Sequence, residues 1–221
     1  MIFSKKQYLF YILGMTSLIF LSYFYVDRDV SMYFIKHADT YKVFGKTMST
    51  LGESQWYIGV AVLGALFFTF VNKNKLLTQR FLFLFYVNIF SGLISVISKF
   101  FFGRLRPWKL ENGENGFGFL IAQNPDFTLL ENINYQISML LKESTHYSSF
   151  PSGHTTTSMA VFTYMSILFP KYIYLWLSIT VIGVASRILA NDHFVSDVLA
   201  GIMLGTLSTL YIYSKMKEKL V

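Results

Sequence analysis

The sequence predicts an all-α membrane protein, a polytopic bundle of six transmembrane helices with both termini in the cytoplasm. Of the 221 residues, 53% are hydrophobic and 19% aromatic, and the chain carries several apolar runs long enough to cross a bilayer. Basic residues gather at the ends of these runs. No linker divides the chain, so we expect a single membrane domain over residues 1–221.

The first expected span, 8–26, follows Lys5 and Lys6. Its layout resembles a signal peptide, but its apolar part is long and no small-x-small cleavage site follows, so we expect a retained helix. The polar stretch after it has apolar residues near helical spacing, which predicts a short helix in the interface. These residues are Val43, Phe44, Met48 and Leu51. The second span is 55–71.

The third span, 81–102, has small or polar residues every three or four positions. They are Asn88, Ser91, Gly92, Ser95 and Lys99. In a bilayer such a face packs against other helices or lines a wet cavity. We therefore expect this face to turn inward and lead to Lys99.

The segment 103–150 is the long hydrophilic loop, expected on the extracytoplasmic side. Thr128 and Glu131 form a capping-box pattern, and an apolar stripe follows it at helical spacing. The stripe comprises Leu129, Leu130, Ile133, Ile137, Leu140 and Leu141. The sequence predicts an amphipathic helix on the membrane surface, which either caps the bundle or gates a substrate.

The last three spans are expected at 152–169, 172–190 and 196–213. Six spans would place four segments on one side of the membrane: the two termini, the second loop and the fourth turn. The charged residues in these segments are nine bases and one acid, Glu218. The bases are Lys5, Lys6, Lys73, Lys75, Arg80, Lys171, Lys215, Lys217 and Lys219. The positive-inside rule makes this side cytoplasmic.

The net charge of +7 does not indicate nucleic-acid binding, because the bases are scattered at helix ends and form no basic soluble face. The chain has no cysteine, which excludes disulfide and thiolate chemistry. The sequence indicates no oligomeric state.

Three polar clusters fall at the face opposite the expected cytoplasmic side. They are Lys99 to Pro107, Pro151 to His154, and Ser186 to Asp197. Each alone has a structural explanation: cations anchored at the interface, a helix start, or a helix-stabilising pair. Their coincidence at one face favours a functional site, since ionisable groups at the edge of a bilayer are costly.

The combined residues suit a tetrahedral oxyanion. Lys99, Arg106 and Arg187 supply three cations, Ser152 supplies a hydroxyl, and Gly153 lets backbone N–H groups approach at a helix N-terminus. Arginine's planar fork binds two oxygens at once, and lysine acts as a point charge.

Two histidines suggest chemistry on that oxyanion. His193 and Asp197 are four apart, so on one helical face the carboxylate would accept the Nδ1 proton and leave Nε2 as a nucleophile. His154, from another helix, would act as general acid. The scheme requires no metal or other cofactor. His154, Asp192, His193 and Asp197 are conceivable ligands, but nearby cations would repel a divalent ion.

These motifs resemble the signature of the type 2 phosphatidic acid phosphatase family. They are Lys99 with Arg106-Pro107, Pro151-Ser152-Gly153-His154, and Ser186-Arg187 with His193 and Asp197. The resemblance implies a metal-independent lipid phosphatase with a phosphohistidine intermediate. His193 would be the nucleophile, His154 the acid and Asp197 the orienting group. Lys99, Arg106, Ser152, Gly153 and Arg187 would hold phosphate, while Arg104 has no role in the motif.

The resemblance implies a cell-envelope lipid as the substrate. The protein is expected in the bacterial cytoplasmic (inner) membrane, with its site on the periplasmic face. Candidates are lipid A, undecaprenyl diphosphate, phosphatidylglycerophosphate and phosphatidic acid. Two alternatives remain: a relative of the vanadium haloperoxidases, which are soluble, and a phospholipid-binding or transport protein without hydrolysis. In the last span, Gly201 and Gly205 continue the face of His193 and Asp197, and we expect them to let a neighbouring helix approach.

Overall fold

The computed structural model describes residues 4–112, 126–142 and 145–220, and these form helices and their connections without a β-strand. The helices are α1 Lys5–Tyr25, α2 Asp27–Lys36, α3 Ala38–Met48, α4 Ser54–Leu66, α5 Lys75–Phe102, α6 Leu129–Lys142, α7 Gly153–Leu168, α8 Ile173–Leu189 and α9 Val195–Met216. A 3₁₀ turn, Ser49–Gly52, precedes α4, and a π-helical turn, Phe67–Val71, extends it.

Among the described residues, five helical stretches are long and apolar enough to cross a membrane. They are Lys5–Tyr25, Ala38–Val71, Lys75–Leu110, Pro170–Leu189 and Val195–Lys219. Many large apolar side chains on these helices are exposed, which suits helices surrounded by lipid. The remaining expected span, 152–169, coincides with α7, a helix of 16 residues that is shorter than a typical spanning helix. Six spans therefore remain a prediction.

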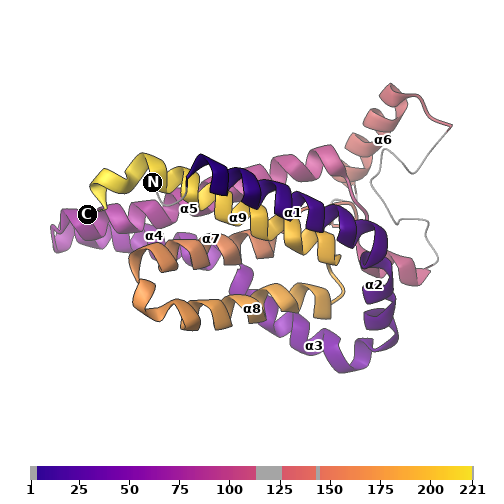
Figure 1. The fold of residues 1–221 in the computed structure, drawn as a ribbon, viewed down its shortest axis with the longest axis horizontal. Coiled ribbons are helices and arrows are strands. Elements are labelled where there is room, and N and C mark those ends of the chain that lie inside the picture. Colours follow the sequence, from indigo (N-terminus) through magenta and orange to yellow (C-terminus); the bar gives the residue numbers. More distant parts are fainter. Residues whose placement is uncertain (1–3, 113–125, 143–144, 221) are drawn as a thin grey trace.

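Helix α7 lies at the centre of the bundle and packs against α5, α8 and α9, while α1 covers α9 and α4 covers α5 (Figure 1). Gly201 and Gly205 of α9 face α7 at close range. A Cβ on Gly201 would lie 2.7 Å from the Ser152 carbonyl oxygen, and one on Gly205 would overlap the Thr156 carbonyl oxygen. The expected inward packing of these glycines is confirmed.

The inward face of α5 is polar. Asn88, Ser91 and Ser95 are buried, and they lead to Lys99 in the last turn. Gly92 differs from the expectation, because nothing lies within 4 Å of a Cβ built there. Gly92 is four residues after Asn88 and lies at the edge of this face, where it is half-buried.

The stretch between α1 and α4 forms two helices, whereas the sequence predicted one short interfacial helix. Helix α3 packs on α8, and a Cβ on Gly45 would lie 2.5 Å from the backbone nitrogen of Ala190. Val43 and Phe44, two of the apolar residues noted in the sequence, are exposed on α3.

Helix α6 confirms the predicted amphipathic helix. Thr128 N–H donates to Glu131 Oε2 at 2.8 Å, and Glu131 N–H donates to Thr128 Oγ1 at 3.4 Å, which is the predicted capping box. Leu129, Leu130 and Leu141 on its stripe are exposed. Leu140 lies outside the residues whose side chains are described.

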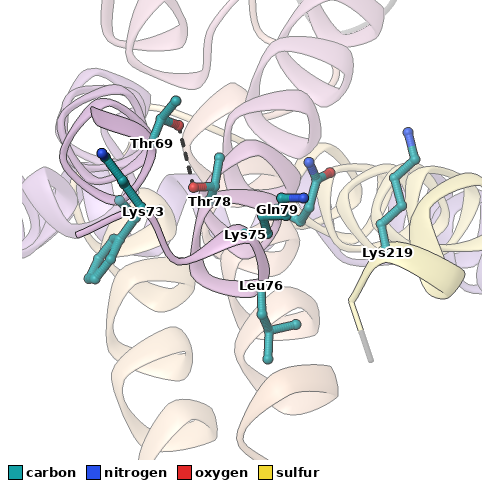
Figure 2. A pocket seen from close by; sticks show the side chains of 8 residues that line it. Thr69, Lys73, Lys75, Leu76, Thr78, Gln79 and Lys219 are labelled. Atoms are coloured by element: carbon teal, nitrogen blue, oxygen red, sulfur yellow. Dashed lines mark hydrogen bonds between the residues drawn. The ribbon is translucent and has the colours of Figure 1, made fainter. Parts of the chain in front are cut away.

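Both termini lie at one end of the bundle, and α2 and α6 lie at the other (Figure 1). At the end with the termini, a pocket of about 620 Å³ is lined by Lys73, Lys75 and Lys219, and Thr69 Oγ1 donates to Thr78 Oγ1 at 3.3 Å beside it (Figure 2). Basic residues from the second loop and the C-terminus thus meet at the same end.

Candidate active site

Backbone hydrogen bonds join three connecting segments into one site. Ser149 N–H donates to the Arg104 carbonyl oxygen at 3.0 Å, and Ser152 N–H donates to the Asp197 carbonyl oxygen at 3.0 Å. The ends of α5, α7, α8 and α9 are thereby fixed together. The segments are 103–107, 146–152 and 190–197.

Gly103 ends α5 in the left-handed conformation, with φ of 50°, and its N–H donates to the Lys99 carbonyl oxygen at 2.9 Å. This turn directs the chain back over the end of the bundle toward Arg106. A Cβ on Gly153 would lie 3.6 Å from Lys99 Nζ. The lysine of the first motif therefore reaches the helix start of the second.

Ser152 caps α7. Its hydroxyl oxygen accepts from Thr155 Oγ1 at 3.0 Å and from Thr155 N–H at 3.5 Å, and its side chain is fully buried. The next two residues, Gly153 and His154, are half-buried at the N-terminus of the helix. Gly52, in the turn before α4, packs closely against His154, because a Cβ on Gly52 would lie 2.8 Å from His154 Cβ.

Arg187 is held by a carboxylate that the motif does not include. Its Nη2 lies 2.9 Å from Asp192 Oδ2, and Lys46 Nζ of α3 donates to both oxygens of Asp192 at 2.8 and 2.9 Å. Burial raises the pKa of Asp192, but Arg187 and Lys46 outweigh burial and leave this pKa below its usual range. Asp192 therefore stays ionised and orients the Arg187 fork.

His193 lies in the loop before α9, almost fully buried. Its Nδ1 is 2.7 Å from the Ser149 carbonyl oxygen. Because a carbonyl oxygen only accepts, Nδ1 carries the proton and Nε2 carries the lone pair. The imidazole is thus held in the tautomer that a nucleophilic Nε2 requires.

Asp197 does not accept the Nδ1 proton, which corrects the expected arrangement. Its Oδ2 is 3.7 Å from His193 Nδ1 and instead accepts from Ser149 Oγ at 2.6 Å and from Phe194 N–H at 2.8 Å. The reason is local: α9 begins at Val195, so His193 and Asp197 do not share a helical face. Asp197 instead contacts Ser149, the residue whose carbonyl oxygen bonds to His193 Nδ1.

The cations of the motifs act on the charge state of His193. Burial lowers the pKa of His193 well below 6.5, and Arg106, Arg187 and Lys99 lower it further, while Asp192 opposes them. The imidazole is therefore neutral in the unliganded protein. Asp192 balances only part of the positive charge of these three cations, so a bound oxyanion would be attracted to them.

All eight residues predicted for the site lie at this end of the bundle, around the three joined segments. Sequence reasoning missed the residues that hold them, namely Asp27, Lys46, Gly52, Arg104, Ser149 and Asp192. Asp192 and Arg104 had a signal, because both are charged and lie inside or beside the motifs. Asp27 and Lys46 come from the far N-terminal part, where the polar stretch gave no sign of a contact.

No group of three or more His, Cys, Asp or Glu side chains suited to a metal ion occurs in the described part of the chain. The charged side chains nearest His193 include three cations, so an anion fits this donor set better than a divalent cation.

The fold and the site define a helical membrane protein with a buried, cation-lined histidine centre at one end of its bundle. The chain belongs to the PAP2 superfamily, which it matches over residues 80–220. This match contains all three motifs, which agrees with the resemblance seen in the sequence.

Three relatives illustrate the family. A lipid A 1-phosphatase of Rhizobium etli is 28% identical over 191 residues, covering 79% of this chain and 72% of that protein. A lipid A 4'-phosphatase of Porphyromonas gingivalis is 28% identical over 168 residues, covering 73% and 61%. The bacitracin transport permease protein BcrC of Bacillus licheniformis is 31% identical over 96 residues, covering 43% and 45%. No solved structure matches.

Proposed function

We propose that this chain is a metal-independent phosphatase that removes a terminal phosphate from a lipid of a bacterial cytoplasmic membrane. One observation carries the proposal: His193 is buried among three cations with its Nδ1 proton on the Ser149 carbonyl, which leaves Nε2 free to attack. Membership of the PAP2 superfamily and the two lipid A phosphatases among its relatives support it.

In the first step, His193 Nε2 attacks the phosphorus atom, and the bond from phosphorus to the lipid oxygen breaks. His154, in its imidazolium form, donates a proton to that oxygen as it leaves and becomes neutral. In the second step, neutral His154 takes a proton from water, the water oxygen attacks phosphorus, and the bond to Nε2 breaks to release inorganic phosphate. Lys99, Arg106 and Arg187 bind the phosphoryl oxygens throughout, with Ser152 and the backbone at Gly153.

Lipid A is the first substrate to test, because two relatives carry its name. Undecaprenyl diphosphate, phosphatidylglycerophosphate and phosphatidic acid are the others. The basic residues around the pocket in Figure 2 support a cytoplasmic position for that end, which would place the site on the periplasmic face.

The test is phosphate release from each of these four lipids by purified protein in detergent, with and without a metal chelator. Wild type should release phosphate from at least one lipid, with or without chelator, and vanadate should inhibit. His193→Ala should lower kcat by roughly a thousandfold or more. The matched control is His37→Ala, at an exposed histidine between α2 and α3. Failure of wild type to hydrolyse any lipid phosphate would contradict the proposal.

A further inference from the structure

Behind Asp197, on the side facing α1 and α2, lies a fully buried polar cluster that the phosphatase motif does not explain. Its members are Asp27 at the start of α2, Arg104 after α5, and Ser196 beside Asp197 in the first turn of α9, and each is 0% exposed. The cluster joins three chain segments that are distant in the sequence.

Arg104 is the centre of this cluster. Its Nη1 donates to Asp197 Oδ1 and to Ser196 Oγ, both at 2.6 Å, and its Nη2 donates to Asp27 Oδ2 at 2.8 Å. The guanidinium carbon lies 4.0 Å from the centre of the Phe194 ring. Arg104 is therefore held from several sides, with one carboxylate on each arm of its fork.

Asp27, at the start of α2, forms hydrogen bonds with both other members of the cluster. Its Oδ1 accepts from Ser196 N–H at 2.9 Å and from Ser22 Oγ at 3.0 Å, and Ser196 Oγ also bonds to Oδ2. Asp27 thus fixes Arg104 and the first turn of α9 together. Stability alone is a poor reason for such a cluster, since buried ion pairs are often replaced by apolar residues without loss of stability.

The cluster connects to His193 through Asp197. Arg104 binds Oδ1 of this carboxylate, so Oδ2 is directed to Ser149 Oγ and Phe194 N–H. Ser149 in turn accepts the Nδ1 proton of His193 on its carbonyl oxygen. The hydrogen-bond sequence from Asp27 to the imidazole is continuous and buried.

We propose that Asp27 and Arg104 are positioning residues for His193, which they hold through Asp197 and Ser149 with Nε2 directed at the bound phosphoryl group. The inference rests on the proposed phosphatase activity. Because both residues reach His193 through Asp197 and Ser149, their loss should affect the direction of attack more than the binding of phosphate.

The test is Asp27→Asn, which keeps the shape of the side chain but turns an amide donor toward the Arg104 fork. Asp29→Asn is the matched control, because Asp29 lies in the same first turn of α2 and is exposed. In the folded fraction, Asp27→Asn should lower kcat about tenfold or more, with KM changed by less than about twofold. Asp29→Asn should match wild type.

A second variant, Ser196→Ala, removes the hydroxyl shared by Arg104 and Asp27 and decides the question if Asp27→Asn does not fold. It should also lower kcat with KM retained. Wild-type kcat per folded molecule in either folded variant, even with a lowered Tm, would overturn the inference, because only a structural role would then remain.

An independent readout does not require turnover. The NMR signal of the His193 imidazole in unliganded protein should move in Asp27→Asn and stay in place in Asp29→Asn. If wild type releases no phosphate from any lipid, the proposed function fails, and this signal still tests the connection from Asp27 to His193. An unmoved signal in Asp27→Asn would contradict it.

Discussion

His193 is kept neutral and in one tautomer by groups on several elements. The Ser149 carbonyl takes its Nδ1 proton, and burial together with the cations at Arg106, Arg187 and Lys99 disfavours a second proton on the ring. A neutral imidazole is what nucleophilic attack requires. In the proposed function the same cations bind the substrate phosphate, so one charge arrangement would serve both tasks.

The titration of His193 follows from this environment. Its pKa is lowered, so the neutral ring should persist as the pH falls through 6.5, and protonation should occur only well below that value. The chain has four histidines, so NMR of labelled protein can assign His193 by the signal missing in His193→Asn. A midpoint at or above pH 6.5 in unliganded protein would contradict the described surroundings.

At the level of residues, the sequence predicted which side chains would gather at one end of the bundle, but not the contacts that orient them. The motifs name His193 and Asp197, and their four-residue spacing favoured a direct hydrogen bond. Helix α9 begins only at Val195, and Ser149 comes from a different loop. A four-residue spacing predicts a side-chain contact only where both residues lie in one continuous helix. The partner of His193, Ser149, is 44 residues away in the sequence, so no local pattern could predict this contact.

The contact between α7 and α9 sets the position of the second and third motifs. Gly201 approaches the Ser152 carbonyl, and Ser152 N–H bonds to the Asp197 carbonyl at the same junction. Backbone atoms meet backbone atoms here, so a larger residue cannot be accommodated by a side-chain rotation.

Gly201→Leu should therefore separate α9 from α7 and destabilise the protein by about 1–3 kcal/mol or more. Activity per folded molecule should fall as well, since Ser152 and Asp197 would move apart. Gly14→Leu in α1 is the control, because nothing lies within 4 Å of a Cβ at that position. Thermal unfolding in detergent gives the comparison. A Gly201→Leu protein as stable and active as wild type would exclude this packing.

At the level of elements, long apolar runs predicted the helices well, because a bilayer requires a long stretch of apolar residues. The polar stretch before α4 was harder. One helix was expected, but α2 and α3 form, and their polar residues Asp27 and Lys46 bond to other parts of the chain. Polar side chains that form hydrogen bonds with distant parts of the chain cannot be distinguished in the sequence from polar side chains exposed to water.

The whole molecule is asymmetric in charge along the bundle. The pocket lined by Lys73, Lys75 and Lys219 lies at the end that carries the termini, and the candidate active site lies at the other end (Figures 1 and 2). Helix α6 adds an exposed apolar stripe at the site end. This distribution favours a cytoplasmic lysine end and an α6 that rests on the outer membrane surface.

The orientation can be measured directly, because the chain contains no cysteine. A membrane-impermeant thiol reagent applied to intact cells, or to spheroplasts where an outer membrane is present, should label Asn134→Cys in α6. It should label Lys219→Cys only after lysis. Both positions are exposed in the structure. Labelling of Lys219→Cys in sealed cells would reverse the predicted topology.

The most direct test of the account is to identify the residue that carries the phosphoryl group. Wild type turning over a lipid phosphate is quenched with denaturant, digested at alkaline pH and mapped by mass spectrometry. We predict an acid-labile phosphohistidine at His193 that is absent from His193→Ala. A phosphoryl group on His154 or on a hydroxyl residue, or wild-type turnover by His193→Ala, would contradict the account.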